Sequence, residues 1–186
     1  MNVKADLDRL LMDSFKELVL TTPVEKITIK EITDKAGVIR PTFYNHFQDK
    51  YEVIERIIQE DITSPARALL EHEMVTEAVT LMFANILKEK EFYLRLSHMS
   101  GQNSFDEIIK EAIKNLLMEF INEHKTNKQG KKGWFTPENM AEYYSQSISF
   151  VVIRWIQRGM DASPRDMSEL HEYVLTHSMM EAINDL

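Results

Sequence analysis

Five side chains between residues 40 and 46 are of the types that recognise nucleic acids. Arginine, asparagine, threonine and histidine hydrogen-bond the edges of bases, and tyrosine and threonine also contact phosphates. These side chains share a short segment with two phenylalanines, so the segment has one apolar and one polar side. The polar side predicts contacts with DNA. The five residues are Arg40, Thr42, Tyr44, Asn45 and His46.

The local pattern predicts two short helices joined by a glycine turn, which would hold these side chains outward. A capping box that begins at Thr28 starts the first helix, and Gly37, the residue type best suited to a left-handed C-cap, ends it. The second helix covers about 40–47 and has proline in its first turn, where the missing N–H costs nothing. Phe43 and Phe47 are four residues apart, so both pack inward.

Two helices in this arrangement form a helix-turn-helix, whose second helix lies in the major groove of DNA. An amphipathic helix predicted over about 4–21 completes an N-terminal three-helix domain, residues 1–50. The alternative is an ordinary helical hairpin with a solvated polar face. Asp49 is predicted to cap the next helix. Lys50 lies in its first turn, where a cation is unfavourable unless an anion is nearby.

Composition indicates an all-α, intracellular protein. The 186 residues contain no cysteine, which excludes disulfides and thiolate metal sites, and only five glycines and five prolines. We expect no signal peptide and no membrane span, because the most apolar stretch, 148–156, is too short, and we therefore expect a cytoplasmic protein. The net charge of −8 belongs to residues 51–186, with 14 basic and 22 acidic side chains, whereas residues 1–50 hold eight of each.

The run from Ile27 to Ile54 resembles the DNA-binding segment of the TetR family of bacterial regulators. The matching residues are Thr28, Ala36, Gly37, Val38, Thr42, Tyr44, Phe47 and Lys50. One departure is Ile39, where the family usually has a serine or threonine that caps the recognition helix. The resemblance implies phosphate contacts by Thr28, Tyr44 and Lys50. It also implies contacts near base edges by Arg40, Pro41, Thr42, Asn45 and His46.

The remainder, residues 51–186, is predicted to be a helical bundle, giving about nine helices in all. Helical spacing predicts helices at about 50–63, 65–72, 75–89, 91–99, 104–126, 137–158 and 164–184. The last two would form a four-helix bundle with those of a second subunit, as the resemblance also implies; the alternative is that they close the core of a monomer. The predicted interface residues are Tyr144, Ile148, Val152, Ile156, Met167, Leu170, Val174 and Ser178.

Regulators of this family usually hold an effector inside this second domain, so the resemblance implies a pocket here for a small molecule. The alternative for each of the aromatic and methionine residues is that it packs in the hydrophobic core and contacts no ligand. The expected lining is Met82, Phe83, Tyr93, Leu96, Phe105, Met118, Tyr143, Ser147 and Trp155.

Two short stretches, MSGQNSF at 99–105 and RWIQRGMDASP at 154–164, resemble the subgroup that includes dihydroxyacetone-kinase regulators. This resemblance implies an alternative role as a transcriptional activator or co-activator.

An enzyme is not expected. The sequence has no Glu-x-x-His pair for a di-iron bundle and no phosphate-binding glycine loop, and the histidines of HEYVLTH at 171–177 are six residues apart instead of the four that a zinc protease needs. We expect no metal and no cofactor. The sequence thus predicts a homodimeric repressor that binds a near-palindromic double-stranded operator and is released by an effector. A helical adaptor that binds protein but not DNA is the second alternative.

Overall fold

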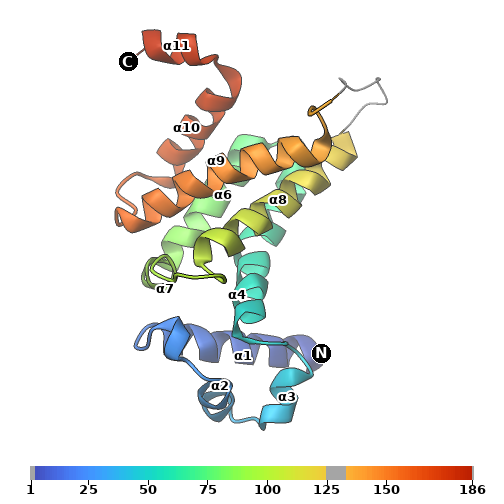
Figure 1. The fold of residues 1–186 in the computed structure, drawn as a ribbon, viewed down its shortest axis with the longest axis vertical. Helices are drawn as coiled ribbons and strands as arrows, with labels where there is room; N and C mark the ends of the chain where they lie inside the picture. The colour runs from blue at the N-terminus through green and yellow to red at the C-terminus, as the bar shows by residue number, and fades with distance from the viewer. Residues whose placement is uncertain (1–2, 125–132, 186) are drawn as a thin grey trace.

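The computed structural model describes residues 3–124 and 133–185, which form helices and turns without any strand (Figure 1). This confirms the all-α fold. No helix within these two ranges is long and apolar enough to cross a membrane. The α-helices are α1 (Val3–Val19), α2 (Ile29–Ala36), α3 (Arg40–Tyr44), α4 (Lys50–Ile58), α5 (Ser64–Glu71), α6 (Val75–Lys88), α7 (Lys90–Leu96), α8 (Phe105–His124), α9 (Pro137–Gln157), α10 (Pro164–Thr176) and α11 (Met179–Asn184).

Helices α1 to α3 form a small head, residues 3–49, at one end of the molecule, and α4 leads from it into the larger body, residues 50–185 (Figure 1). The head is closed by a 3-10 turn, η1 (Val24–Lys26), between α1 and α2. Its core consists of apolar side chains from all three helices. Leu11, Phe15, Ile32, Phe43 and Phe47 are at most 1% exposed.

The junction between α4 and α5 is a π-helical turn, η2 (Gln59–Thr63), and Pro65 explains why the α-helix is interrupted there. Proline has no N–H to donate to the carbonyl four residues earlier, that of Asp61. The Asn85 side chain on α6 supplies the missing donor, with Nδ2 2.7 Å from the Asp61 carbonyl oxygen. The predicted break between the helices at about 50–63 and 65–72 is therefore a widened π-helical turn that leads directly into α5.

Two helical layers make up the rest of the body. Helices α8 and α9 pack along each other in one layer, and α5, α6 and α10 pack together in the other. The C-terminal part of α10 and helix α11, residues 170–185, continue from this layer as an arm that extends away from the rest of the body (Figure 1). The single helix predicted over 164–184 is wrong. Ser178 begins a new helix because its hydroxyl accepts from the Glu181 N–H while the Glu181 carboxylate accepts from the Ser178 N–H.

Tyr93 on α7 lies in the core between head and body, and its hydroxyl has no hydrogen-bond partner among the described residues. Burial raises the pKa of this phenol well above its usual value, and the charges of Asp61 and Glu89 add to the effect. An unpaired buried hydroxyl is destabilising, so we expect Tyr93→Phe to raise the free energy of unfolding by about 1 kcal/mol. Urea denaturation would measure the change. A loss of stability in Tyr93→Phe would show that the hydroxyl is hydrogen-bonded.

Candidate DNA-binding surface and internal cavity

The turn before α3 has the geometry expected for a helix-turn-helix. Thr28 caps α2 in a complete capping box, and Gly37 ends that helix in the left-handed conformation, with φ at 68°. Its N–H contacts the carbonyls of Thr33 and Asp34. Ile39 takes the N-cap position of α3 without any side-chain hydrogen bond and is 70% exposed. Pro41 in the first turn therefore favours the start of α3, since Ile39 has no hydroxyl that could cap the helix.

Packing of two phenylalanines fixes which side of this segment faces outward. The rings of Phe43 and Phe47 lie 5.8 Å apart and are buried against the head. Arg40 and Tyr44 are one helical turn apart on the opposite side, where the Arg40 Nη2 donates to the Tyr44 hydroxyl at 3.1 Å and the guanidinium lies 5.7 Å from the ring centre. The structure thus brings together an exposed surface, the recognition surface, made of Ile39, Arg40, Pro41, Tyr44 and Asn45, with Thr42 half-buried beside it.

His46 does not lie on the recognition surface, although the resemblance implied a contact near base edges. Its Nδ1 is 2.5 Å from the Asp8 Oδ1 on α1, and both side chains are only 10% exposed. The turn that follows α3 carries the imidazole toward α1 instead of toward solvent. In this position His46 fixes the end of the recognition helix against the rest of the head.

Lys50 also has a different environment from the one expected for a phosphate contact. Its ammonium group donates to the carbonyl oxygens of Val24 at 2.7 Å, Glu25 at 3.0 Å and Ile27 at 2.9 Å. Burial lowers the pKa of Lys50, although the carboxylate of Glu25 acts in the opposite direction. The lysine at the start of α4 therefore donates to carbonyl oxygens in and just after η1, one of which, that of Val24, also accepts from the Ile27 N–H. Asp49 caps α4 as predicted and accepts from the N–H groups of residues 51 and 52.

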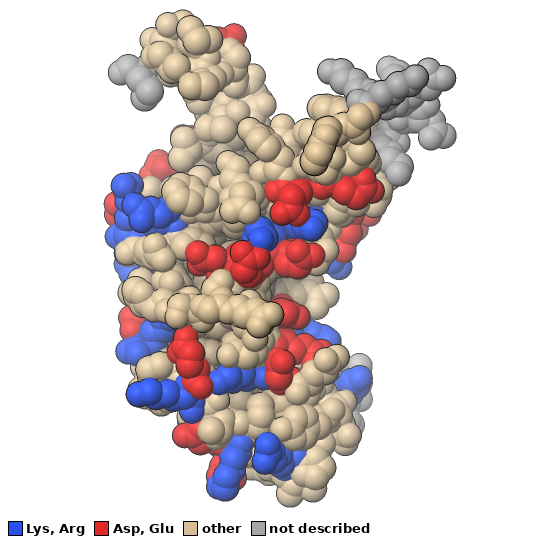
Figure 2. Space-filling view, in the orientation of Figure 1, with Lys and Arg blue, Asp and Glu red and all other residues tan. Residues whose placement is uncertain are grey.

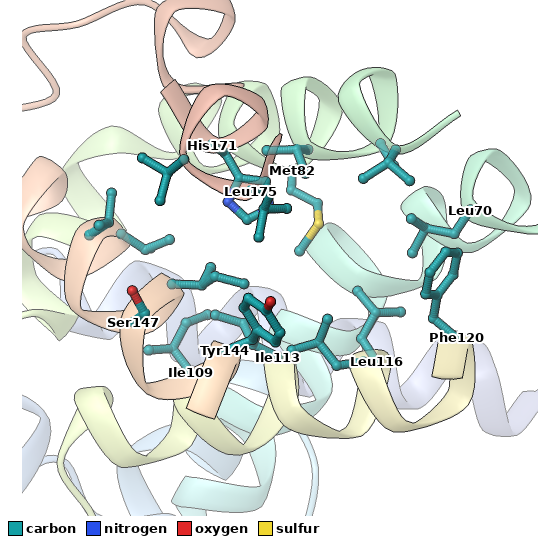
Figure 3. A pocket seen from close by; sticks show the side chains of 18 of the residues that line it. Leu70, Met82, Ile109, Ile113, Leu116, Phe120, Tyr144, Ser147, His171 and Leu175 are labelled. Carbon is teal, nitrogen blue, oxygen red and sulfur yellow. The ribbon is translucent and has the colours of Figure 1, made fainter. Parts of the chain in front are cut away.

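A cavity of about 1060 Å³, partly open to solvent, lies between the two helical layers (Figure 3). Side chains from η2, α5, α6, α8, α9 and α10 line it, and almost all of them are aliphatic or aromatic. The lining residues with polar groups on their side chains are Thr136, Tyr144, Ser147 and His171. In Figure 3 the Tyr144 hydroxyl and the His171 ring point into the space from opposite layers.

Three residues of the predicted pocket, Met82, Phe83 and Ser147, line this cavity. The other six lie outside its lining. Tyr93, Leu96 and Phe105 are fully buried. Tyr93 and Leu96 lie on α7, which packs against α1, and Phe105 at the start of α8 contacts the Tyr93 ring. The Trp155 ring contacts Phe83 edge-on while its Nε1 donates to the Ala162 carbonyl. Met118 is half-buried on α8, and Tyr143 is 71% exposed on α9.

Most of the predicted interface residues face the cavity. Within the described chain, Ile156 is completely buried and Ser178 caps α11, so neither lies on an apolar outer face. The exposed apolar residues on α9 are instead Tyr143 and Phe150, which are seven residues apart. The sequence pattern did not predict an exposed apolar surface at these two positions. The cavity lining from the predicted interface is Tyr144, Ile148, Val152, Met167, Leu170 and Val174.

The arm carries a further apolar surface that sequence reasoning missed. Met179, Met180 and Ile183 are 50–78% exposed, and Leu170, Val174 and Leu175 are partly exposed at the cavity rim. Figure 2 shows this end of the molecule covered mainly by uncharged side chains. Exposed apolar patches of this kind mark interaction sites. The sequence signal for this exposed apolar surface was the pair Met179 and Met180, which directly follows the helix cap Ser178.

Comparison with known proteins gives the family. A family model described as bacterial regulatory proteins of the tetR family matches residues 14–57, and one described as a transcriptional regulator C-terminal region matches residues 73–177. No curated protein sequence matches the chain significantly.

Three solved structures illustrate the likeness of fold. FadR from Thermus thermophilus, a transcriptional repressor in complex with lauroyl-CoA, is 18% identical over 92% of this chain and 94% of its own, with a TM-score of 0.62. The dihydroxyacetone kinase operon activator DhaS is 19% identical over 88% and 90%, with a TM-score of 0.57. NalD, a repressor of a multidrug efflux pump in Pseudomonas aeruginosa, is 16% identical over 91% and 93%, with a TM-score of 0.56. With its helix-turn-helix head and its helical C-terminal region, the chain belongs to the TetR family of bacterial transcriptional regulators.

Proposed function

We propose that this protein is a homodimeric repressor that binds a near-palindromic operator and is released when a small molecule enters its cavity. The observation that carries the proposal is the recognition surface, where polar side chains stand outward on a helix fixed from behind by buried phenylalanines. A surface of this composition on the second helix of a helix-turn-helix fits the major groove.

Different residues of the head have different proposed roles. Arg40 and Asn45 hydrogen-bond base edges, and Pro41 and Ile39 pack on thymine methyl groups. Thr42 lies close to the base edges and to the methyl groups. Thr28 and Tyr44 contact phosphates from either side. His46 and Lys50 support this surface from within the head through the contacts described above.

The proposed dimer uses the exposed apolar residues of α9 and of the arm. Tyr143 and Phe150 on α9 and Met179 and Met180 on α11 are each more than 60% exposed in the single chain. Covering these side chains with the same residues of a second subunit would give an isologous interface about a twofold axis. Each dimer would then present two recognition surfaces to two half-sites.

A direct structural link joins the cavity to the head. Ile62 in η2 lines the cavity, and its neighbour Asp61 pairs with Lys16 of α1 at 2.5 Å. Glu89, between α6 and α7, lies 3.6 Å from the same ammonium group. A ligand that displaces η2 would therefore move the anchor of α1 and change the spacing of the two heads.

Selection of genomic DNA with the purified full-length protein tests the proposal. We expect enrichment of a near-palindrome whose half-site centres are about one helical turn apart, bound by two subunits. Arg40→Glu should abolish the enrichment, because it reverses a charge at the groove. Arg95→Glu, an equal change of charge on α7, should not. A protein that enriches no sequence, or that stays single in solution, would contradict the proposal.

An activator is the second candidate, favoured by the structural likeness to DhaS, which is named an operon activator. A reporter gene placed behind the selected site distinguishes the two roles. Repression predicts higher expression when the regulator is deleted, and activation predicts lower expression.

A further inference from the structure

The cavity lining offers no cation to a ligand. Among the described residues that line it there is no lysine, no arginine, no aspartate and no glutamate. Burial lowers the pKa of His171, so its imidazole is neutral at pH 7 and can either donate or accept a single hydrogen bond. The Tyr144 and Ser147 hydroxyls likewise lie on the lining, opposite or beside this ring (Figure 3).

Two cations on the helices that line the cavity are paired with carboxylates. Arg67 on α5 contacts Glu119 at 2.9 Å. Lys114 on α8 contacts Glu142 at 2.7 Å. Residues 51–186 as a whole carry eight more acidic than basic side chains. The local pairs and the overall charge both disfavour an anionic ligand.

Burying an ionised carboxylate or phosphate in this environment would be costly. A charge transferred to an apolar site needs a partner of opposite sign or several strong hydrogen bonds, and otherwise it stays in water. A hydroxyl or carbonyl group needs only one or two hydrogen bonds. The lining polar groups are therefore matched to a neutral head group and not to an acid.

The shape of the cavity restricts the ligand further. Its lining on α8 extends from Ile109 to Ile121, a length of about 18 Å at 1.5 Å per residue. Leu70 and Phe120 lie at one end and Ser147 toward the other (Figure 3). An elongated apolar chain fills such a space better than a compact ring system of the same volume.

We propose that the cavity binds an elongated, uncharged apolar molecule with a hydroxyl or carbonyl end, of the chemical class of a long-chain alcohol or ketone. A free fatty acid whose carboxylate lies within the lining would be disfavoured by its charge. The inference rests on the proposed function, in which this cavity holds the effector. It narrows the effector to one chemical class.

Calorimetric titration of the full-length protein with two molecules of equal chain length tests the inference. The probes are 1-dodecanol and dodecanoate, compared at pH 8, where the carboxylic acid is ionised. We expect the alcohol to bind at least about tenfold more tightly, since the acid must leave water without a counter-ion. Equal or tighter binding of dodecanoate would overturn the inference.

A single substitution should reverse this preference. His171→Arg places a cation inside the lining, so dodecanoate should gain at least about tenfold over dodecanol relative to the original protein. Thr176→Arg adds the same charge on an exposed part of α10 and serves as the matched control, with no change in preference expected. No binding of dodecanol, together with a crystal of the dimer in which a second copy fills the cavity, would also overturn the inference.

These outcomes are separate from those of DNA binding. The titrations contain no DNA, so alcohol binding by a protein that enriches no genomic sequence would support the ligand class and contradict the repressor. Conversely, a protein that selects an operator but prefers dodecanoate would retain its proposed function and lose the inference.

Discussion

Lys50→Met is expected to lower the free energy of unfolding by about 1–2 kcal/mol, because three carbonyl oxygens, two of them in partly buried surroundings, would lose a charged donor. The methionine keeps most of the length and apolar contact of the lysine stem, so the loss reports on the ammonium group. The carbonyls of Val24, Glu25 and Ile27 all belong to the connection between α1 and α2. Urea denaturation followed by circular dichroism would measure the change.

The same substitution distinguishes a structural lysine from a phosphate contact. If Lys50 holds the head together, Lys50→Met weakens binding to operator and random duplexes alike while the dependence on salt stays nearly constant. If it contacts a phosphate, the salt slope falls by roughly one unit with little loss of stability. Lys30→Met is the matched control, because Lys30 is exposed and pairs only with Asp34 on its own helix. Its effect on stability should be much smaller than that of Lys50→Met, because exposed ion pairs contribute little.

Arg40→Ala is expected to remove about 1–3 kcal/mol of discrimination at one base pair of each half-site, the range for a bidentate contact between arginine and guanine. Arg40 suits this role because it is exposed at the start of α3 and is oriented by the Tyr44 hydroxyl and ring. Binding to random duplexes should fall much less, since other contacts to the backbone remain. Fluorescence anisotropy with the selected operator and with single-base variants would measure the loss.

Tyr44→Phe separates the orientation of Arg40 from its contact with DNA. The variant keeps the ring under the guanidinium and removes the hydroxyl, which accepts from Arg40 and is also the proposed phosphate contact. We therefore expect a smaller loss of discrimination at the same base pair than in Arg40→Ala, together with weaker binding to operator and random duplexes alike. If Arg40→Ala weakened operator and random DNA equally, Arg40 would be a phosphate contact and the base-reading role would be refuted.

Interactions between residues close together in the sequence determined most of the structure of the head. The capping box at Thr28, the left-handed Gly37 and the Asp49 cap all involve residues within four positions of one another, and each lies where the sequence predicted it. The spacing of Phe43 and Phe47 likewise fixed the inward side of the recognition helix. Such features form from neighbouring residues, so one chain read alone is enough to predict them. The all-α class followed from the same helical periodicity.

Contacts between distant residues were beyond this reasoning. His46 meets Asp8 across 38 positions, and Lys50 meets Ile27 across 23, and no local pattern indicates either partner. Helix α9 presents apolar residues to several sides, so its periodicity predicts burial but not which side faces the cavity and which side stays exposed. Only the packing of α9 on α8, with α6 and α10 across the cavity, placed Tyr144 and Ile148 inward and Tyr143 and Phe150 outward. The sequence by itself thus determined the helices and the outward side of the reading head, because these depend on near neighbours. The tertiary structure decided the hydrogen-bond partners of His46 and Lys50 and the position of the cavity, because these depend on which helices meet.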